Sequence, residues 1–231
     1  MSKKNYFIVL GILILFVAVY AVQENLLIDD DSIENPEYIT SLEAMGMNSL
    51  ISAVTYKGVS DFGSIYIQYL VAKTDLDFSQ EAMTVSLGCR EEVIALRSEY
   101  TTISEGNISD KDLKKNIEIS ENTQLVLNEK INGEVVLDDI QKQYFSIGIL
   151  FQAASLSKNI IVVENLNAYV EYVKELKGFK KAKEAKKLKK ATKIISTLPG
   201  IIANQTSNLK LMVDIAGTNN IEIPEDVTNL F

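Results

Sequence analysis

Apolar residues recur along the first half of the chain with the spacing of α-helices. Thr40 and Glu43 have the spacing of a capping box, and apolar positions follow at helical intervals, so we predict one long helix over 41–73. Asp77 or Ser79 is expected to cap a second helix that runs to about residue 104. The glycines of the first helix lower its intrinsic stability but permit close contact with a neighbour.

The second half of the chain has the clearest helical patterns. A third helix is expected between Ser109 and Gly133, and a fourth over 134–157. The apolar face of the fourth helix comprises Val136, Ile140, Tyr144, Ile147, Phe151 and Ala154. The fifth helix, after Asn159, repeats apolar residues at steps of 4, 3, 4 and 3, as in a coiled coil or on one face of a bundle. These residues are Val162, Leu166, Tyr169, Val173 and Leu176.

Proline is scarce, and no convincing set of strands appears, so helices are favoured throughout. The three prolines, Pro36, Pro199 and Pro224, lie near the ends of helical patterns, and a last helix is expected after Pro199. We therefore predict an all-α fold, an antiparallel bundle of about five or six helices over residues 40–216. A C-terminal tail is expected over 217–231.

The N-terminal segment has the pattern of an export signal. Two lysines precede an apolar run of 17 residues, and acidic residues follow it. The run is slightly shorter than the about 20 residues that a spanning helix needs. Residues 1–23 are therefore a signal peptide, with cleavage after Ala21 favoured, or an uncleaved membrane anchor, and residues 24–39 form an acidic spacer. The charge asymmetry places the body outside the cytoplasm, in a bacterial periplasm, either soluble or tethered.

Composition excludes several classes of active site. The chain has no histidine and one cysteine, Cys89, so imidazole catalysis, a structural zinc site and an intrachain disulfide are excluded. Nucleotide-binding and hydrolase motifs are missing, and we expect no cofactor, no metal site and no catalytic residue. Ser155 with Lys158, and Ser207 with Lys210, have the spacing of a serine–lysine pair, but we interpret all four as exposed helix residues.

Other charged residues are explained by structure rather than by chemistry. Arg90 and Arg97 lie seven residues apart on one helix face, and neighbouring glutamates favour surface ion pairs over an anion clamp. The aspartates at 29–31 lack the pattern of a calcium loop. Asp138 and Asp139 stabilise the first turn of the fourth helix through its dipole.

A lysine-rich stretch stands out in this acidic chain. Residues 174–193 hold ten lysines and two glutamates, a charge of +8, within a chain of net charge −8. Apolar residues recur there every three positions from Phe179, which gives the helix no separate apolar face. We interpret the stretch as a solvated helical arm. The alternative is an anion-binding element whose residues are Lys180, Lys181, Lys183, Lys186, Lys187, Lys189 and Lys190.

The sequence therefore favours an exported, non-enzymatic protein that acts by binding a protein partner or another copy of itself, as a scaffold or accessory. Two alternatives remain open: a sensor or binding domain for a small ligand held between helices, and a binder of anionic surfaces through the lysine-rich arm. An anionic membrane or an envelope polymer fits that arm, and its binding would weaken with salt. Nucleic acid is not expected, because of the export signal and the lack of interleaved aromatic residues.

Overall fold

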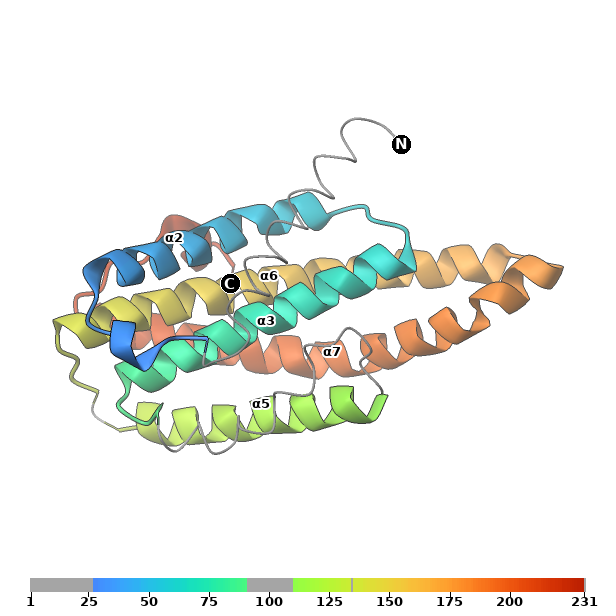
Figure 1. Ribbon diagram of the computed structural model, residues 1–231. Helices are drawn as coiled ribbons and strands as arrows, with labels where there is room; N and C mark the ends of the chain where they lie inside the picture. The colour runs from blue at the N-terminus through green and yellow to red at the C-terminus, as the bar shows by residue number, and fades with distance from the viewer. Residues whose placement is uncertain (1–26, 91–109, 134, 231) are drawn as a thin grey trace.

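The computed structural model describes residues 27–90, 110–133 and 135–230, and within these ranges the chain is all-helical, with no strand (Figure 1). The expected fold class is confirmed at this level, whereas the expected signal or anchor at 1–23 lies outside the described residues. The elements are η1 (Asp30–Ser32), α2 (Pro36–Ser52), η2 (Ala53–Tyr56), α3 (Phe62–Ser86), α5 (Asp110–Ile131), α6 (Asp139–Glu175), α7 (Gly178–Thr218) and α8 (Glu225–Thr228).

Helix α2 begins earlier than expected. Asn35 caps it by accepting hydrogen bonds from the backbone N–H groups of Glu37 and Tyr38, and Pro36 occupies the first turn, where its missing N–H costs nothing. The predicted capping box at Thr40 is therefore wrong. Its hydroxyl lies inside the helix and donates to the carbonyl of Pro36.

The expected helix over 41–73 is two helices. The chain leaves α2 at residue 52 and turns at Gly58, whose φ of +75° is accessible mainly to glycine. Asp61 then caps α3 through the N–H of Ser64. By contrast, α3 continues without a break through Asp77 and Ser79, where a second helix was expected to begin. Ser79 is buried there and donates to the carbonyl of Gly148, so a polar residue was mistaken for a helix end.

Helix α6 is the central element, since α2, α3 and α7 all pack on it. It joins the expected fourth and fifth helices into 37 residues, with Asp138 as the N-cap in a capping box with Gln141. Val136 precedes the helix and is exposed, whereas Tyr144, Ile147, Phe151 and Ala154 are buried as expected. Among the described helices, α6 alone is long and apolar enough to cross a membrane, but 78% of its most apolar stretch is buried by neighbouring helices.

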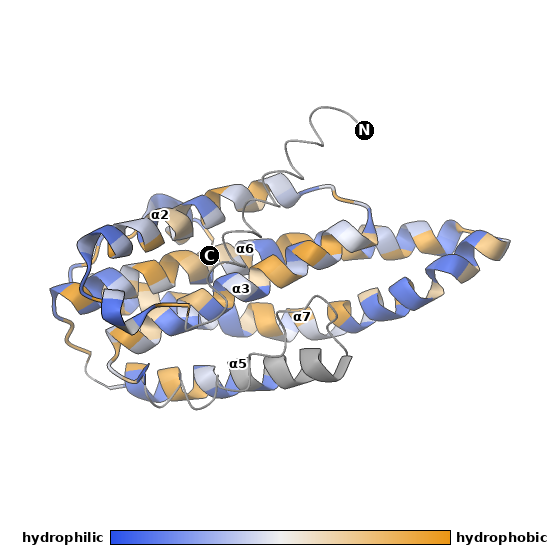
Figure 2. Ribbon diagram, in the orientation of Figure 1, coloured by the Kyte–Doolittle hydropathy of each residue, from blue (hydrophilic) through white to orange (hydrophobic). Residues whose placement is uncertain are grey.

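Helix α7 joins the lysine-rich arm and the expected last helix into one element of 41 residues, with Pro199 inside it. Its buried side recurs at steps of 3 and 4 only from Leu188 onward, whereas Phe179, Ala182 and Ala185 of the lysine-rich arm are exposed. The buried side packs on α6. Figure 2 shows that the first turns of α7, which precede this contact, are mostly hydrophilic. The inward positions include Leu188, Ala191, Leu198, Gln205, Leu209, Met212 and Ala216.

Both flanking segments pack on the helices more closely than expected. Ile28, within the expected acidic spacer at 24–39, is buried, and its N–H donates to the carboxylate of Glu81. The expected tail at 217–231 folds back, with Val227 buried in the core and Asn219 bonded through its side chain to the N–H of Leu137. The packed body thus starts before residue 40 and extends beyond residue 216.

Candidate functional site

The lysine-rich stretch forms one arm of a helical hairpin that projects beyond the other helices (Figure 1). We call residues 171–193 the basic hairpin: the last turn of α6, the turn at 176–177 and the first turns of α7. Gly178 begins α7 with a φ of +57°, so the reversal uses a backbone conformation that L side chains rarely adopt. Most lysines of the basic hairpin are exposed to solvent.

Two of the seven candidate lysines have partners that fix them at the base of the hairpin. Lys187 forms an ion pair with Glu184, with 3.1 Å between Nζ and Oε2. Lys190 places its Nζ 3.9 Å from the centre of the Tyr66 ring, a cation–π contact with α3. These two residues contribute to the structure and are less available to a ligand.

The other candidate lysines face solvent. Lys181 donates to the backbone carbonyl of Lys174 across the hairpin, 3.3 Å away, and no described acidic residue forms an ion pair with it. The remaining four are exposed and form no ion pair with any residue that the structure describes. They are Lys180, Lys183, Lys186 and Lys189.

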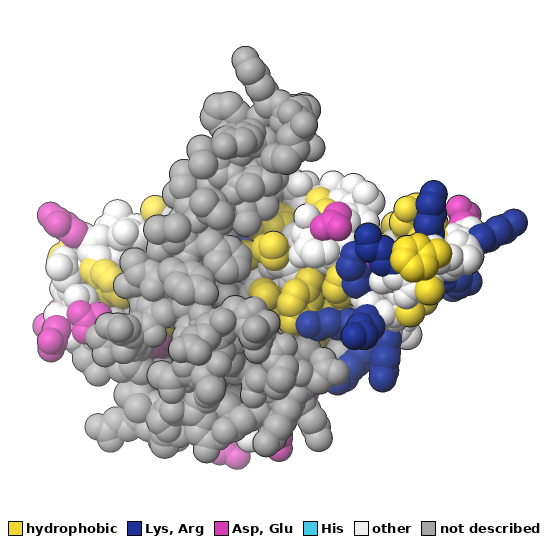
Figure 3. All heavy atoms as spheres, turned by 45° about the vertical axis from the view of Figure 1, so that its right-hand side comes forward, with side chains coloured by type: hydrophobic (Ala, Val, Ile, Leu, Met, Phe, Trp, Pro, Cys, Tyr) yellow, Lys and Arg dark blue, Asp and Glu magenta, His cyan; other side chains and the backbone are white. Residues whose placement is uncertain are grey.

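An aromatic side chain occupies the apex of the basic hairpin. Phe179 is 84% exposed, the most exposed of the large apolar side chains in the described ranges. Figure 3 shows apolar side chains at this end of the molecule surrounded by lysines. Tyr172, on the last turns of α6, is 57% exposed. The apex therefore combines cationic groups with apolar surface.

The base of the hairpin is held by aromatic residues. The hydroxyl of Tyr169 donates to Oε2 of Glu184 at 2.7 Å, and its ring lies 5.4 Å from that of Phe62 between centroids. Burial, and then the Glu184 carboxylate, raise the pKa of Tyr169, whereas the hydrogen bonds from Tyr169 and Lys187 lower the pKa of Glu184. The hydrogen bond thus joins α6 to α7 and orients the hairpin.

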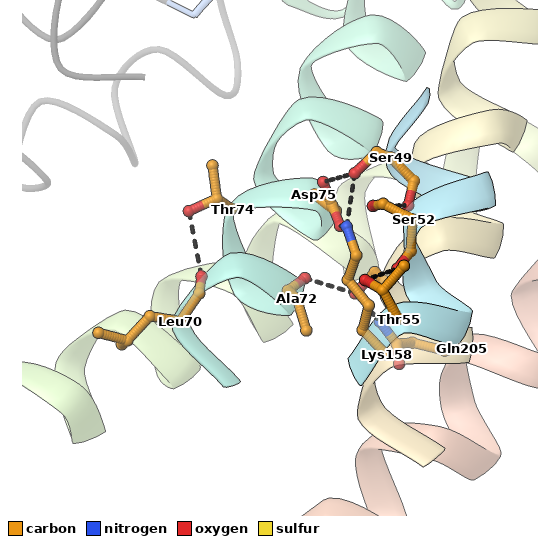
Figure 4. Close-up of polar contacts among 10 residues, drawn as sticks. Ser49, Ser52, Thr55, Leu70, Ala72, Thr74, Asp75, Lys158 and Gln205 are labelled. Atoms are coloured by element: carbon orange, nitrogen blue, oxygen red, sulfur yellow. Dashed lines mark hydrogen bonds and ion pairs between the residues drawn. The ribbon is translucent and has the colours of Figure 1, made fainter. Parts of the chain in front are cut away.

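The interpretation of Ser155 and Lys158 as exposed residues is wrong, because both are fully buried. They do not face each other either. The Nζ of Lys158 lies 2.6 Å from Oδ2 of Asp75 and 2.6 Å from the hydroxyl of Ser49, which in turn donates to Asp75 (Figure 4). Burial raises the pKa of Asp75, and the Lys158 charge opposes that change. This ion pair links α2, α3 and α6 inside the protein.

Carboxamides extend the buried polar interior. Ser155 donates to the carbonyl of Ala72 and accepts from Gln205, and Gln205 also accepts from Asn159. A separate group joins Asn165 to Gln68 and to the carbonyl of Tyr56. Each hydrogen bond connects different elements, so these polar residues determine how the helices align.

Serine–lysine chemistry is not supported by this geometry. Lys158 is already bound to Asp75, and Ser49 donates its own proton to the same carboxylate. Ser49, Asp75 and Lys158 are each at most 5% exposed, so a substrate has no access to the hydroxyl. The second pair, Ser207 and Lys210, is exposed as expected, with the serine hydroxyl bonded to the carbonyl of Ala203.

The remaining candidates have structural roles. Arg90 donates to the carbonyl of Ile28, and Arg97 lies outside the described residues. Asp29 accepts hydrogen bonds within its own turn, and the described residues contain no group of acidic, cysteine or histidine side chains that could hold a metal ion. Cys89 is buried, as expected for a core residue.

Part of the buried polar interior had a signal in the sequence. Continuing the 4–3 spacing of the fifth helix backwards from Val162 gives Asn159, Ser155 and then Gln152, all three of which are buried. The same spacing on α7 gives Gln205 among apolar residues. Polar residues at inward positions of a helix indicate buried hydrogen bonds, not exposed surface.

In comparisons with known proteins, no family model, no curated protein and no solved structure matches this chain. Function is therefore inferred from the chain's own residues, and these point to the basic hairpin as the surface available for binding.

Proposed function

We propose that this chain is a non-enzymatic helical-bundle protein that attaches to anionic membrane surfaces through the basic hairpin. The observation that supports this most strongly is the apex, where Phe179 is 84% exposed among lysines at the end of a projecting pair of helices. Most of the surface of this apolar ring lies in solvent in the structure. A partner outside the chain explains both the ring and the charges.

The charge distribution favours an anionic partner. Residues 174–193 carry +8, so the rest of the chain carries −16 to give the total of −8. Exposed charges act over about 10 Å at 0.1 M salt, and the hairpin projects beyond the other described helices (Figure 1), which moves its outermost lysines away from them. The hairpin can therefore approach a negative surface with little repulsion from the remainder of the protein.

The aromatic apex favours a lipid surface over an acidic protein. Aromatic rings are enriched at the headgroup level of membranes, and each nearby lysine adds about 1 kcal/mol of attraction to an anionic leaflet. The apolar face of α7 is already packed on α6, so the hairpin attaches by its end and binding is reversible. If the N-terminal segment is an uncleaved anchor, it would keep the body beside the same membrane.

Vesicle sedimentation tests this proposal. The protein is expected to bind vesicles of phosphatidylglycerol and phosphatidylcholine at low salt, to ignore phosphatidylcholine alone, and to dissociate as salt rises towards about 0.5 M. The double variant Lys183→Gln/Lys186→Gln should weaken binding by roughly 30-fold, from about 1 kcal/mol for each lysine. Its matched control, Lys57→Gln/Lys142→Gln, removes two lysines outside the hairpin and should bind normally.

A second pair of variants separates a membrane from a soluble acidic partner. Phe179→Ser should weaken vesicle binding. Val54→Ser removes another exposed apolar side chain, outside the hairpin, and should leave vesicle binding unchanged. Full vesicle binding by Phe179→Ser would mean that charge alone is recognised and would argue against the membrane. Binding that ignores salt, or unchanged binding by the lysine variant, would exclude the hairpin as the contact surface.

A further inference from the structure

A second site lies where α3, α5, α6 and α7 meet, in a cleft of about 440 Å³. This volume falls within the range of about 300–1,000 Å³ that is typical of small-molecule sites. None of the hairpin lysines lines it, so its function does not depend on the proposed membrane contact. Aliphatic side chains form part of the wall, among them Leu76, Leu198 and Ile201.

Carboxamides dominate the polar lining of the cleft. Seven of its side chains are asparagine or glutamine, and they come from all four helices. Gln80 of α3 donates a long hydrogen bond of 3.5 Å to Gln124 of α5. Gln124 in turn donates to Asn128 on the same helix. A carboxamide offers two donors and two acceptor lone pairs, more than these contacts use on Gln124 and Asn128.

Asn159 adds an unused acceptor at the wall contributed by α6. Its Nδ2 donates to Gln205, which is itself held by Ser155, so the orientation of the amide is fixed from the interior. Its Oδ1 is buried and accepts no hydrogen bond within the part of the chain that the structure describes. A buried acceptor without a donor is unfavourable, and a small shift that brings it to a ligand O–H or N–H would satisfy it.

The charges in the cleft do not favour an ionic ligand. Among the described residues that line it, Lys73 is the one lysine, and its Nζ lies 3.3 Å from Oδ1 of Asp77. Glu121, the one acidic residue of the described lining, is exposed on α5. An anion would meet Glu121, and a cation would meet Lys73, so neither sign is selected.

We infer that the cleft binds an uncharged molecule with neighbouring hydroxyl groups, that is, a sugar ring, either free or as the ribose of a nucleoside. Each hydroxyl both donates and accepts, and two adjacent hydroxyls match the C=O and NH₂ of one carboxamide. The C–H faces of such a ring pack on the aliphatic wall.

Saturation-transfer NMR and calorimetry on the full chain test this inference with methyl glucoside and adenosine as probes. At least one of them should bind. Dideoxyadenosine, which lacks the two ribose hydroxyls, should bind at least about tenfold more weakly than adenosine if the nucleoside is the ligand. If the ligand is a free sugar, glucose 6-phosphate should bind more weakly than methyl glucoside, because its phosphate is charged. The inference would be overturned if neither methyl glucoside nor adenosine binds. It would also be overturned if the probe that binds does so equally well without its hydroxyls or with an added phosphate.

Two variants locate the site. Asn159→Leu removes the unused acceptor, and Gln124→Leu changes the α5 wall without touching the interior, so both should abolish probe binding. Asn167→Leu is the matched control, because Asn167 is an exposed asparagine two turns further along α6 and outside the cleft. Unchanged binding by Gln124→Leu, or loss of binding in Asn167→Leu, would contradict the assignment. The far-UV circular dichroism spectrum of each variant should match that of the original protein, which shows that the variants are folded.

Discussion

Lys158 and the lysines of the basic hairpin represent two opposite uses of the same residue. Lys158 is 1% exposed and bound to both Asp75 and Ser49, whereas Lys183 and Lys186 face solvent without an ion-pair partner in the described chain. Removing a charge from the interior leaves its partner unpaired and poorly solvated. Removing an exposed charge from the hairpin leaves no buried charge unpaired, because water takes the place of the side chain. The interior lysine therefore concerns stability, and the hairpin lysines concern binding.

The largest expected effect comes from breaking the interior ion pair. Lys158→Met leaves Asp75 buried without its counter-ion and should lower the free energy of unfolding by about 3–5 kcal/mol, measured by urea denaturation. Asp75→Leu/Lys158→Met removes both charges and should recover most of the loss. Lys186→Met, the matched change on the hairpin, should alter stability by no more than about 0.5 kcal/mol. Equal effects of Lys158→Met and Lys186→Met would remove the distinction between the two regions.

Pro199 lies between the lysine-covered and the packed parts of α7. It has no N–H to donate to the carbonyl of Ile195, and a proline inside a helix costs up to about 3 kcal/mol. Because Pro199 is exposed, Pro199→Ala should stabilise the protein by about 1–3 kcal/mol and raise its melting temperature. A lower melting temperature would mean that the surrounding helices require the local distortion.

The tyrosines of the interior provide a pH-dependent test of the packing. Burial raises the pKa of Tyr56, Tyr69 and Tyr144 to about 12, with Asp75 as a further cause at Tyr56. A free tyrosine has a pKa of about 10, so the stability that the neutral phenols contribute is complete below pH 10 and is lost as pH rises through 12.

An absorbance titration of tyrosinate checks this expectation. A group of phenols should ionise only near pH 12, together with unfolding, and Tyr69→Phe should reduce this late phase by one phenol. Ionisation of all ten tyrosines near pH 10 in a protein that remains folded would contradict the burial of these rings.

The pattern of apolar residues predicted helices correctly but not their ends. Ser79, Ser155, Lys158 and Asn159 were interpreted as caps or exposed positions, because polar residues in a single sequence do not reveal their partners. Each forms a hydrogen bond with a residue far along the chain, such as Asp75 for Lys158 across 83 positions. Local spacing cannot show such contacts, although the 4–3 repeat places Ser155 and Asn159 on the buried side.

The basic hairpin was the part of the candidate site that the sequence located best. The run of charges predicted exposed lysines without reference to any partner, and the candidate lysines are exposed except for Lys190, which is half-buried over Tyr66. What the sequence could not predict is that Phe179 stands at the apex. Its position depends on the antiparallel pairing of α6 with α7, which is a tertiary contact.

The most direct test of membrane attachment uses the absence of tryptophan from the chain. Phe179→Trp introduces a single fluorescent reporter at the apex, and Val54→Trp places a matched reporter at an exposed site on η2, away from the hairpin. On addition of phosphatidylglycerol vesicles, we expect the emission of Phe179→Trp to shift to shorter wavelength and to return when salt is added, with no shift for Val54→Trp. No shift at residue 179, or equal shifts at both positions, would contradict attachment through the basic hairpin.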